Sequence, residues 1–165
     1  FLSEELKVPV KKIKSFVLGG HGDSMVAMLG LTEINGKKIN DLIKEGKLSE
    51  ERLDQIVNRT KKGGAEIVKY LEKGSAFYAP AASGVEMAEC YIKDLKKQLP
   101  CAVHLKGEYG TNDIYAGVPV IIGSKGVEKV IELDLSAEEK INFDNSIKAV
   151  KELFDAAKKI DPDLQ

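Results

Sequence analysis

The alternation of apolar and polar residues between positions 101 and 135 constrains the fold more than any other feature of this sequence. Cys101, Val103 and Leu105 alternate with Ala102, His104 and Lys106, which is the period of a strand with one buried face. Glycine-rich segments at 107–110 and 123–126 divide this region into strand-length pieces. We therefore expect an antiparallel meander, with strands at 101–106, 118–122 and 131–135.

Three helical patterns surround the predicted strands. Ser49 can cap a helix over 49–72, which Gly63 and Gly64 interrupt; the helix bends there, breaks into two, or meets another surface closely. A second helix carries an apolar face that runs to Leu99 and ends at Pro100, and Pro119 places the next strand at an edge or a strand start. Ser136 and Glu139 form a capping box for a last helix.

These elements predict an α+β fold, in which an antiparallel sheet is packed with long helices in a single domain over residues 1–165. The sequence shows no run of parallel βαβ units and no Gly-x-Gly-x-x-Gly fingerprint after a strand, so we expect no Rossmann domain in this chain. The segment 1–7 has the pattern of a helix end without a cap. We therefore expect the chain to be a fragment or a processed piece of a longer protein.

The composition narrows the possible functions. The net charge is −1 and hydrophobic residues make up 43% of the chain, which argues against a nucleic-acid partner and for a globular protein. The sequence contains no apolar run long enough to cross a membrane. The spacing of Cys90 and Cys101 matches no metal site, and so few thiols favour a reducing, cytoplasmic location.

The segment 16–26, Phe-Val-Leu-Gly-Gly-His-Gly-Asp-Ser-Met-Val, holds the main candidate for chemistry. His21 follows an apolar strand and has glycine on both sides, which leaves an uncrowded backbone around a ring that must meet a ligand. Histidine is also the side chain best suited to move a proton near neutral pH. A glycine-flanked histidine is also an ordinary turn residue, and the segment alone does not separate the two interpretations.

Two other sets of residues have plainer interpretations. His104 shares the polar face of its strand with Lys106, so we treat it as a surface histidine. The small-residue run 76–83 suits close packing of a partner or ligand, whereas Phe77 and Tyr78 within it are expected to be core aromatics.

Several motifs in a fixed order resemble the lactate/malate dehydrogenase family. Gly19-Gly20-His21-Gly22-Asp23-Ser24 is similar to the active-site signature of that family. The later segments 63–68, 74–83, 107–110 and 117–120 resemble its malate branch in sequence and order. The resemblance covers essentially the whole chain and implies the C-terminal catalytic and substrate-binding domain of such an enzyme.

The resemblance implies an NAD-dependent oxidoreductase that interconverts malate and oxaloacetate, a reaction of the tricarboxylic acid cycle, and that works as a homo-oligomer. His21 matches the catalytic histidine, which donates or accepts the proton. Ala76 falls where the family binds substrate, and Pro80 falls near where it packs against the cofactor. No metal ligand is implied.

The resemblance also implies parts that this sequence does not contain. They are the nucleotide-binding half, the aspartate that orients the histidine, the arginine that holds the substrate carboxylate and the mobile-loop arginine that selects malate. Arg52 and Arg59 match none of them. We therefore expect the isolated chain to be inactive, and two alternatives stay open: a lactate dehydrogenase piece, or a non-catalytic oligomerisation domain.

Overall fold

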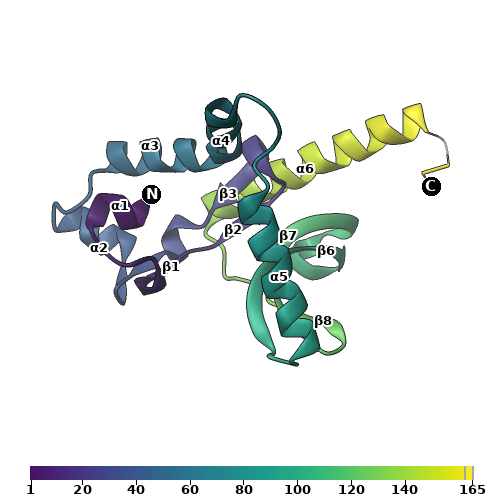
Figure 1. Ribbon diagram of the computed structural model, residues 1–165, viewed down its shortest axis with the longest axis horizontal. Coiled ribbons are helices and arrows are strands. Elements are labelled where there is room, and N and C mark those ends of the chain that lie inside the picture. The colour runs from purple at the N-terminus through teal and green to yellow at the C-terminus, as the bar shows by residue number, and fades with distance from the viewer. Residues whose placement is uncertain (162, 165) are drawn as a thin grey trace. The chain divides into compact units, whose positions relative to one another are not determined.

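The computed structural model describes residues 1–161 and 163–164, and the chain forms two compact units. Unit 1 comprises Phe1–Phe16 and Ala27–Ala79, and unit 2 comprises Val17–Val26 and Pro80–Gln165. Helices and antiparallel strand pairs occur in both units (Figure 1), which confirms the predicted α+β class. The single domain over residues 1–165 stays a prediction.

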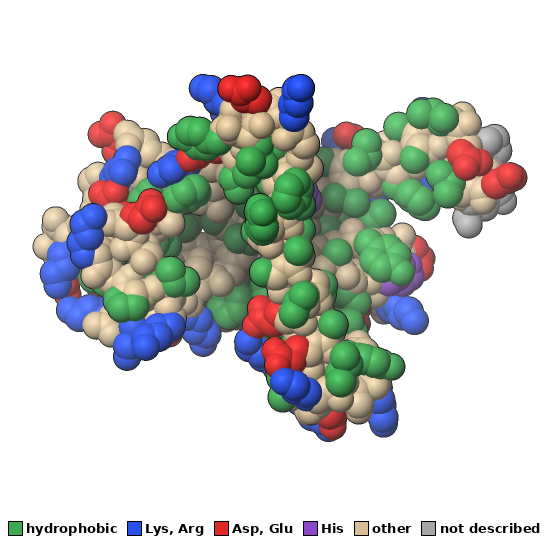
Figure 2. All heavy atoms as spheres, viewed as in Figure 1, with side chains coloured by type: hydrophobic (Ala, Val, Ile, Leu, Met, Phe, Trp, Pro, Cys, Tyr) green, Lys and Arg blue, Asp and Glu red, His purple; other side chains and the backbone are tan. Residues whose placement is uncertain are grey.

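The surface has no dominant charge sign. On the face drawn in Figure 2, Lys and Arg side chains are interspersed with Asp and Glu side chains, as the net charge of −1 leads one to expect. In the part of the chain that the structure describes, no helix combines the length and the apolar character that a membrane span needs.

Unit 1 combines a small sheet with short helices. The sheet has the strand order β1-β4-β5, and a tight turn at Asn35 and Gly36, both with positive φ, joins its last two strands. Such a turn suits an Asn-Gly pair. The elements of this unit are α1 (Leu2–Leu6), β1 (Ile13–Lys14), β4 (Glu33–Ile34), β5 (Lys37–Lys38), α2 (Ile39–Lys44), α3 (Glu50–Lys61) and α4 (Gly63–Leu71).

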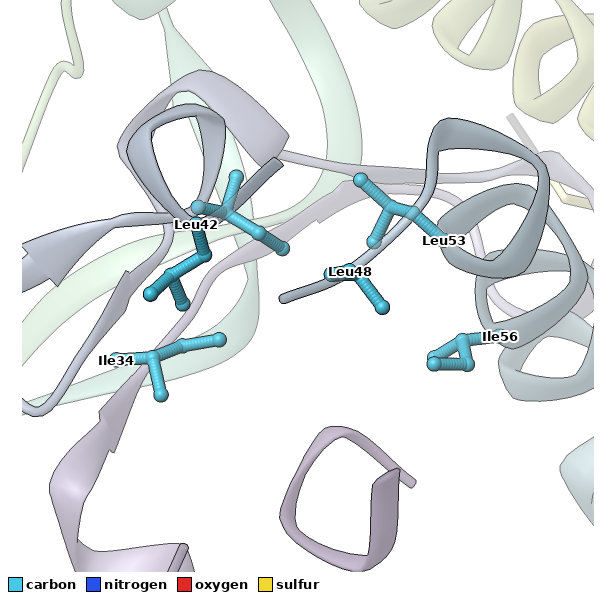
Figure 3. Packing of buried hydrophobic residues seen from close by; sticks show 6 residues of the cluster. Ile34, Leu42, Leu48, Leu53 and Ile56 are labelled. Atoms are coloured by element: carbon cyan, nitrogen blue, oxygen red, sulfur yellow. The ribbon is translucent and has the colours of Figure 1, made fainter. Parts of the chain in front are cut away.

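The core of unit 1 lies between α2, α3 and the small sheet (Figure 3). Its buried members are Ile34, Ile39, Leu42, Leu48, Leu53 and Ile56. The sequence analysis did not predict α2, although Ile39 and Leu42 stand at the i, i+3 spacing of a helix that buries one face.

The helix predicted over 49–72 is two helices, α3 and α4, with the break at Lys62. Ser49 caps α3 as expected, because its side chain accepts a hydrogen bond from the Arg52 N–H (3.1 Å). A Cβ atom added at Gly63 or Gly64 would meet no described atom within 4 Å. Within the described chain, these glycines therefore serve the break rather than a close backbone contact.

Unit 2 is built on a larger sheet with the strand order β3-β2-β7-β6, to which β8 adds by pairing with β7. Helix α5 packs on this sheet, since Met87 Sδ lies 3.4 Å from Cys101 Sγ on β6. The elements are β2 (Val17–Gly19), β3 (Met25–Ala27), α5 (Tyr78–Ile92), β6 (Lys97–Lys106), β7 (Asn112–Gly123), β8 (Gly126–Val130) and α6 (Ala137–Ile160).

The prediction that Pro100 ends a helix is wrong, because α5 ends at Ile92 and Pro100 lies inside β6. The prediction that Pro119 stands at a sheet edge or at a strand start is also wrong. Pro119 lies inside β7, which has neighbouring strands on both sides. The two prolines are direct cross-strand partners. Pro100 is tolerated because β6 is an edge strand, where the missing N–H faces no neighbour.

The missing N–H of Pro119 explains where β8 stops. The Pro119 carbonyl accepts a hydrogen bond from the Ile131 N–H (2.8 Å), so the nitrogen of Pro119 also faces that side. It cannot continue the ladder, and β8 ends at Val130. The strand predicted at 131–135 is therefore not a strand in the structure, and its residues Glu132 and Asp134 are exposed.

Tyr109 fastens this segment to the turn that precedes β7. Its hydroxyl donates to the Ile131 carbonyl (2.7 Å) and accepts from the Leu133 N–H (3.0 Å). Burial raises the pKa of Tyr109 above its ordinary value, so the hydroxyl keeps its proton and stays a donor. The ring packs on Phe143 of α6, with 5.1 Å between ring centroids.

Helix α6 begins at the capping box that the sequence predicts, with Ser136 and Glu139 each accepting from the other's backbone N–H. Phe143 and Ile147 are buried in unit 2, whereas Phe154, further along the helix, is 42% exposed. The first half of the helix is therefore part of the core of unit 2, and this half supports the site described next.

Candidate functional site

The candidate site is the turn that joins β2 to β3 in unit 2. His21 has extended backbone geometry (φ −94°, ψ 149°) and stands directly before a single 3₁₀ turn over Gly22–Ser24. Its side chain is exposed. Among the described residues, no side chain or backbone group hydrogen-bonds to the imidazole, so the ring is free to exchange a proton with a ligand.

The glycines before the histidine have a packing reason. Gly19 has φ +88°, in the left-handed region, and a Cβ atom there would collide with Ser146 Oγ and lie 2.8 Å from Ser146 Cβ. At Gly20 a Cβ atom would collide with Ser24 Oγ. Across the sheet, Gly117 pairs with Gly19, and a Cβ atom on it would lie 2.9 Å from the Gly19 carbonyl oxygen.

These contacts refine the expectation that glycines keep the backbone around His21 uncrowded for a ligand. Gly22 fits that expectation, since a Cβ atom there meets no described atom within 4 Å. Gly19 and Gly20 instead make room for protein atoms, because the turn lies directly against α6 and its own serine. The glycine pair before His21 therefore shapes the turn rather than opening it.

Ser146, on α6, is a site residue that the sequence analysis missed. Its hydroxyl accepts a hydrogen bond from the Gly20 N–H (2.8 Å) and donates one to the Ser24 carbonyl (2.5 Å). The residue is only 4% exposed. One signal could have found it: position 146 follows Phe143 by three residues and precedes Ile147, so it is a polar residue on the buried face of the helix.

A cavity of about 660 Å³ lies beside the turn and is lined only by residues of unit 2. Its wall includes Gly19, Gly20 and His21, and the remainder comes from β2, β6, β7 and α6 together with Ser24. No Asp, Glu, Lys or Arg is found among the described residues of this lining. Burial raises the pKa of the Cys101 thiol in the wall, so this thiol stays protonated near neutral pH.

The structure does not gather the other predicted site residues around this cavity. Ala76 is half-buried in the connection between α4 and α5 and belongs to unit 1. Pro80 is exposed in the first turn of α5, in unit 2, and is not among the residues that line the cavity. The substrate role of Ala76 and the cofactor role of Pro80 stay predictions.

The aromatic residues between Ala76 and Pro80 are not in the core. Phe77 is 52% exposed and Tyr78 is 81% exposed, so the expectation that they are core aromatics is wrong. The two rings pack against each other, with 5.1 Å between centroids. This segment presents aromatic surface outward.

His104 and the arginines have structural partners. His104 is half-buried on β6 and stacks edgewise on Tyr115 of β7, with 5.2 Å between ring centroids. Arg52 donates to Glu5 (2.8 Å), and Arg59 donates two hydrogen bonds to Glu66 (2.9 and 2.6 Å). Both arginines lie on α3 in unit 1, and each is held by a carboxylate.

We predict that Gly19→Ala destabilises the chain by about 2–4 kcal/mol, as the sum of left-handed strain and overpacking against Ser146. The measurement is chemical denaturation of the chain, followed by circular dichroism. Gly22→Ala is the matched control: Gly22 has φ +74° but an open surrounding, so we expect a loss of only about 1 kcal/mol. Equal losses of stability in the two variants would show that overpacking against Ser146 does not contribute to the destabilisation.

Comparison with known proteins gives consistent matches. Residues 1–160 match the sequence model of the family described as "lactate/malate dehydrogenase, alpha/beta C-terminal domain". A curated malate dehydrogenase from Pelagibacter ubique (strain HTCC1062) is 66% identical over 164 residues, which are 99% of this chain and 51% of that protein. This chain thus spans about half the length of that relative.

Solved structures agree with these matches. The crystal structure of Cryptosporidium parvum malate dehydrogenase matches with a TM-score of 0.92 at 40% identity, over 96% of this chain and 50% of that one. The lactate dehydrogenase of Eimeria maxima, solved with NADH and oxamate, matches with a TM-score of 0.93 at 40% identity, over 98% of this chain and 50% of that one. Malate and lactate enzymes therefore match this fold equally well.

Proposed function

This chain belongs to the lactate/malate dehydrogenase family as its C-terminal domain, and we propose that it is the proton-transferring half of an NAD-dependent malate dehydrogenase. The observation that carries the proposal is the position of His21. Its imidazole is exposed at a cavity, without a hydrogen-bond partner among the described residues, on a turn whose backbone is held by α6. A ring in this setting can accept and return a proton without breaking a structural contact.

In the proposed reaction, His21 removes the hydroxyl proton of malate and returns it to oxaloacetate in the reverse direction. When bound, NAD accepts the hydride from the carbon that carries the hydroxyl group. The charge on the imidazole then rises by one, and the exposed position of the ring keeps that charge in contact with water. Because an imidazole can both accept and donate a proton, the same residue serves both directions.

The lining of the cavity fits only part of a dinucleotide. It is mostly apolar and offers no Lys or Arg among the described residues, which suits the flat face of an aromatic ring and not a pyrophosphate. We therefore assign the main cofactor surface to the other half of a full-length protein, in which this chain is joined to a nucleotide-binding domain. Pro80 of this chain is proposed to contact the nicotinamide end.

Malate is proposed over lactate because the relative at 66% identity is a malate dehydrogenase. The segment Ala76–Pro80, which resembles the malate branch, supports the same substrate, and Ala76 is proposed to contact it. A cytoplasmic location is proposed as well, with Cys90 and Cys101 as free thiols.

Self-association of the full-length protein is part of the proposal. Hydrophobic side chains lie exposed along α5 on the face drawn in Figure 2, and the exposed apolar residues of this helix include Val85, Met87, Tyr91 and Ile92. A set of exposed apolar side chains of this kind supports an interface between subunits. It also keeps open the alternative of a non-catalytic assembly domain.

The test is an assay of the full-length protein with NAD, followed by NADH absorbance, beside sizing by light scattering. We expect kcat/KM for malate to exceed that for lactate by at least about 100-fold, because a site with a charged partner for the second carboxylate rejects a substrate without it. Higher turnover of lactate would assign the lactate branch. An oligomer that oxidises neither substrate would contradict the proposal and favour the assembly domain.

A further inference from the structure

We propose that Ser146 is a positioning residue for the proton-transferring histidine, and this inference rests on the function proposed above for His21. The buried hydroxyl of Ser146 joins both ends of the turn that carries the ring to the rigid half of α6. Its loss is expected to slow proton transfer through misplacement of the imidazole rather than through loss of the fold.

The geometry of the two hydrogen bonds carries the inference. Ser146 Oγ accepts from the Gly20 N–H (2.8 Å) and donates to the Ser24 carbonyl (2.5 Å). Only His21, Gly22 and Asp23 lie between those two backbone groups. A single oxygen atom therefore ties both limbs of the turn to α6, in addition to the pairing of β2 with β3 and β7.

Among the described residues, no hydrogen bond places the imidazole directly. Its ring forms no hydrogen bond among the described residues, and the Ser24 hydroxyl donates only to the His21 carbonyl, at 3.4 Å. In the absence of a partner for the ring, its position follows from the backbone of the turn. That backbone is the part that Ser146 holds.

The support behind Ser146 is rigid. Phe143 is 0% exposed and Ile147 is 5% exposed on the same face of α6, and the helix start is fixed by its capping box. The left-handed φ of Gly19 brings β2 so near to Ser146 that a side chain would collide with the hydroxyl. The absence of a side chain at Gly19 therefore permits the hydrogen bond between Ser146 and the Gly20 N–H.

Tyr109→Phe offers a closely matched control for Ser146→Ala. Each variant removes one hydroxyl that accepts from a backbone N–H and donates to a backbone carbonyl, and both lie in unit 2. The two should therefore destabilise the protein by similar amounts. The hydrogen bonds and the ring contact of Tyr109 involve Ile131, Glu132, Leu133 and Phe143 and no residue of the His21 turn, so only Ser146→Ala should alter catalysis.

The experiment uses the full-length protein and measures kcat, the KM for NAD and hydrogen exchange of peptides that span 17–28. In Ser146→Ala we expect kcat for malate to fall by about 10- to 100-fold, because small misplacement of a catalytic group has effects of this size. The KM for NAD should stay within about twofold, and the 17–28 peptides should exchange at least about ten times faster, because the Gly20 N–H loses its acceptor. Tyr109→Phe should keep wild-type kcat and wild-type exchange in these peptides.

The possible outcomes distinguish a failure of the positioning role of Ser146 from a failure of the function proposed for His21. A Ser146→Ala protein with wild-type kcat, or with a loss no larger than that of Tyr109→Phe, overturns the positioning role. If the wild-type protein does not oxidise malate, the proposed function fails, and the exchange measurement decides alone: unchanged exchange at 17–28 overturns the anchoring. If Ser146→Ala does not fold, Ser146→Cys keeps a similar volume with a much weaker hydrogen-bonding group and is judged by the same criteria.

Discussion

Replacing His21 with asparagine in the full-length protein is expected to lower kcat for malate oxidation by roughly 10²- to 10⁴-fold, the usual contribution of a positioned general base. Asparagine keeps a polar side chain of similar reach but cannot take up a proton near neutral pH. Because His21 is exposed and its ring has no partner among the described residues, we expect the free energy of unfolding to change by less than about 0.5 kcal/mol. Steady-state kinetics with saturating NAD and a denaturation curve measure the two effects.

The other histidine of the chain supplies the control. His104→Asn removes the edgewise contact with Tyr115, which lines the same cavity, and should leave kcat within about threefold, because exposed aromatic pairs stabilise by only about 1 kcal/mol. Binding of NADH, followed by its fluorescence, should be the same in both variants. If His21→Asn keeps wild-type kcat while it binds NADH, His21 is a turn residue and the proposed role is wrong.

Local rules predicted the elements of this chain where a single signal decided the structure. The Ser49 cap of α3 and the capping box of Ser136 and Glu139 are found where the sequence places them. The predictions for Pro100 and Pro119 were wrong because the effect of a proline in a strand depends on the neighbouring strands. Pro100 breaks no hydrogen bond because β6 is an edge strand, and Pro119 only shortens the pairing of β7 with β8. Both effects depend on the strand order, which is a property of the whole sheet.

The sequence predicted the reactive residue of the candidate site, His21, but not Ser146, which holds the turn. His21 stands out because glycines flank it, and the same glycines carry the family resemblance. Ser146 lies 126 positions from Gly20, so its contact with the turn depends on how α6 packs against β2. The exposure of Phe77 and Tyr78 was not predictable either. Aromatic residues are usually buried, and only the structure shows that these two are not.

The isolated 165-residue chain is expected to have no measurable NAD-dependent malate oxidation, with kcat/KM at least about 10⁴-fold below that of the full-length protein, since positioning of reactants alone contributes effects of this size. Malate carries two carboxylates, and the cavity beside His21 presents no Lys or Arg among its described lining residues. Arg52 and Arg59, the arginines of this sequence, are held by Glu5 and Glu66. The chain thus has a proton acceptor without a cation to hold the substrate next to it.

Among the described residues, no carboxylate hydrogen-bonds to the His21 ring and supports its charged form. A catalytic imidazole that is not hydrogen-bonded to a carboxylate loses both its orientation and the stabilisation of its positive charge, and a loss of about 10⁴-fold follows in enzymes that depend on such a pair. The measurement is NADH formation by the purified chain, with its intact mass verified so that no full-length protein contributes. Addition of the separately expressed nucleotide-binding half is the positive control, and we expect it to restore turnover if the two halves associate. Turnover by the chain alone at the level of the full-length protein would show that His21 needs neither an orienting acid nor a substrate clamp, and it would contradict the division of labour proposed for the two halves.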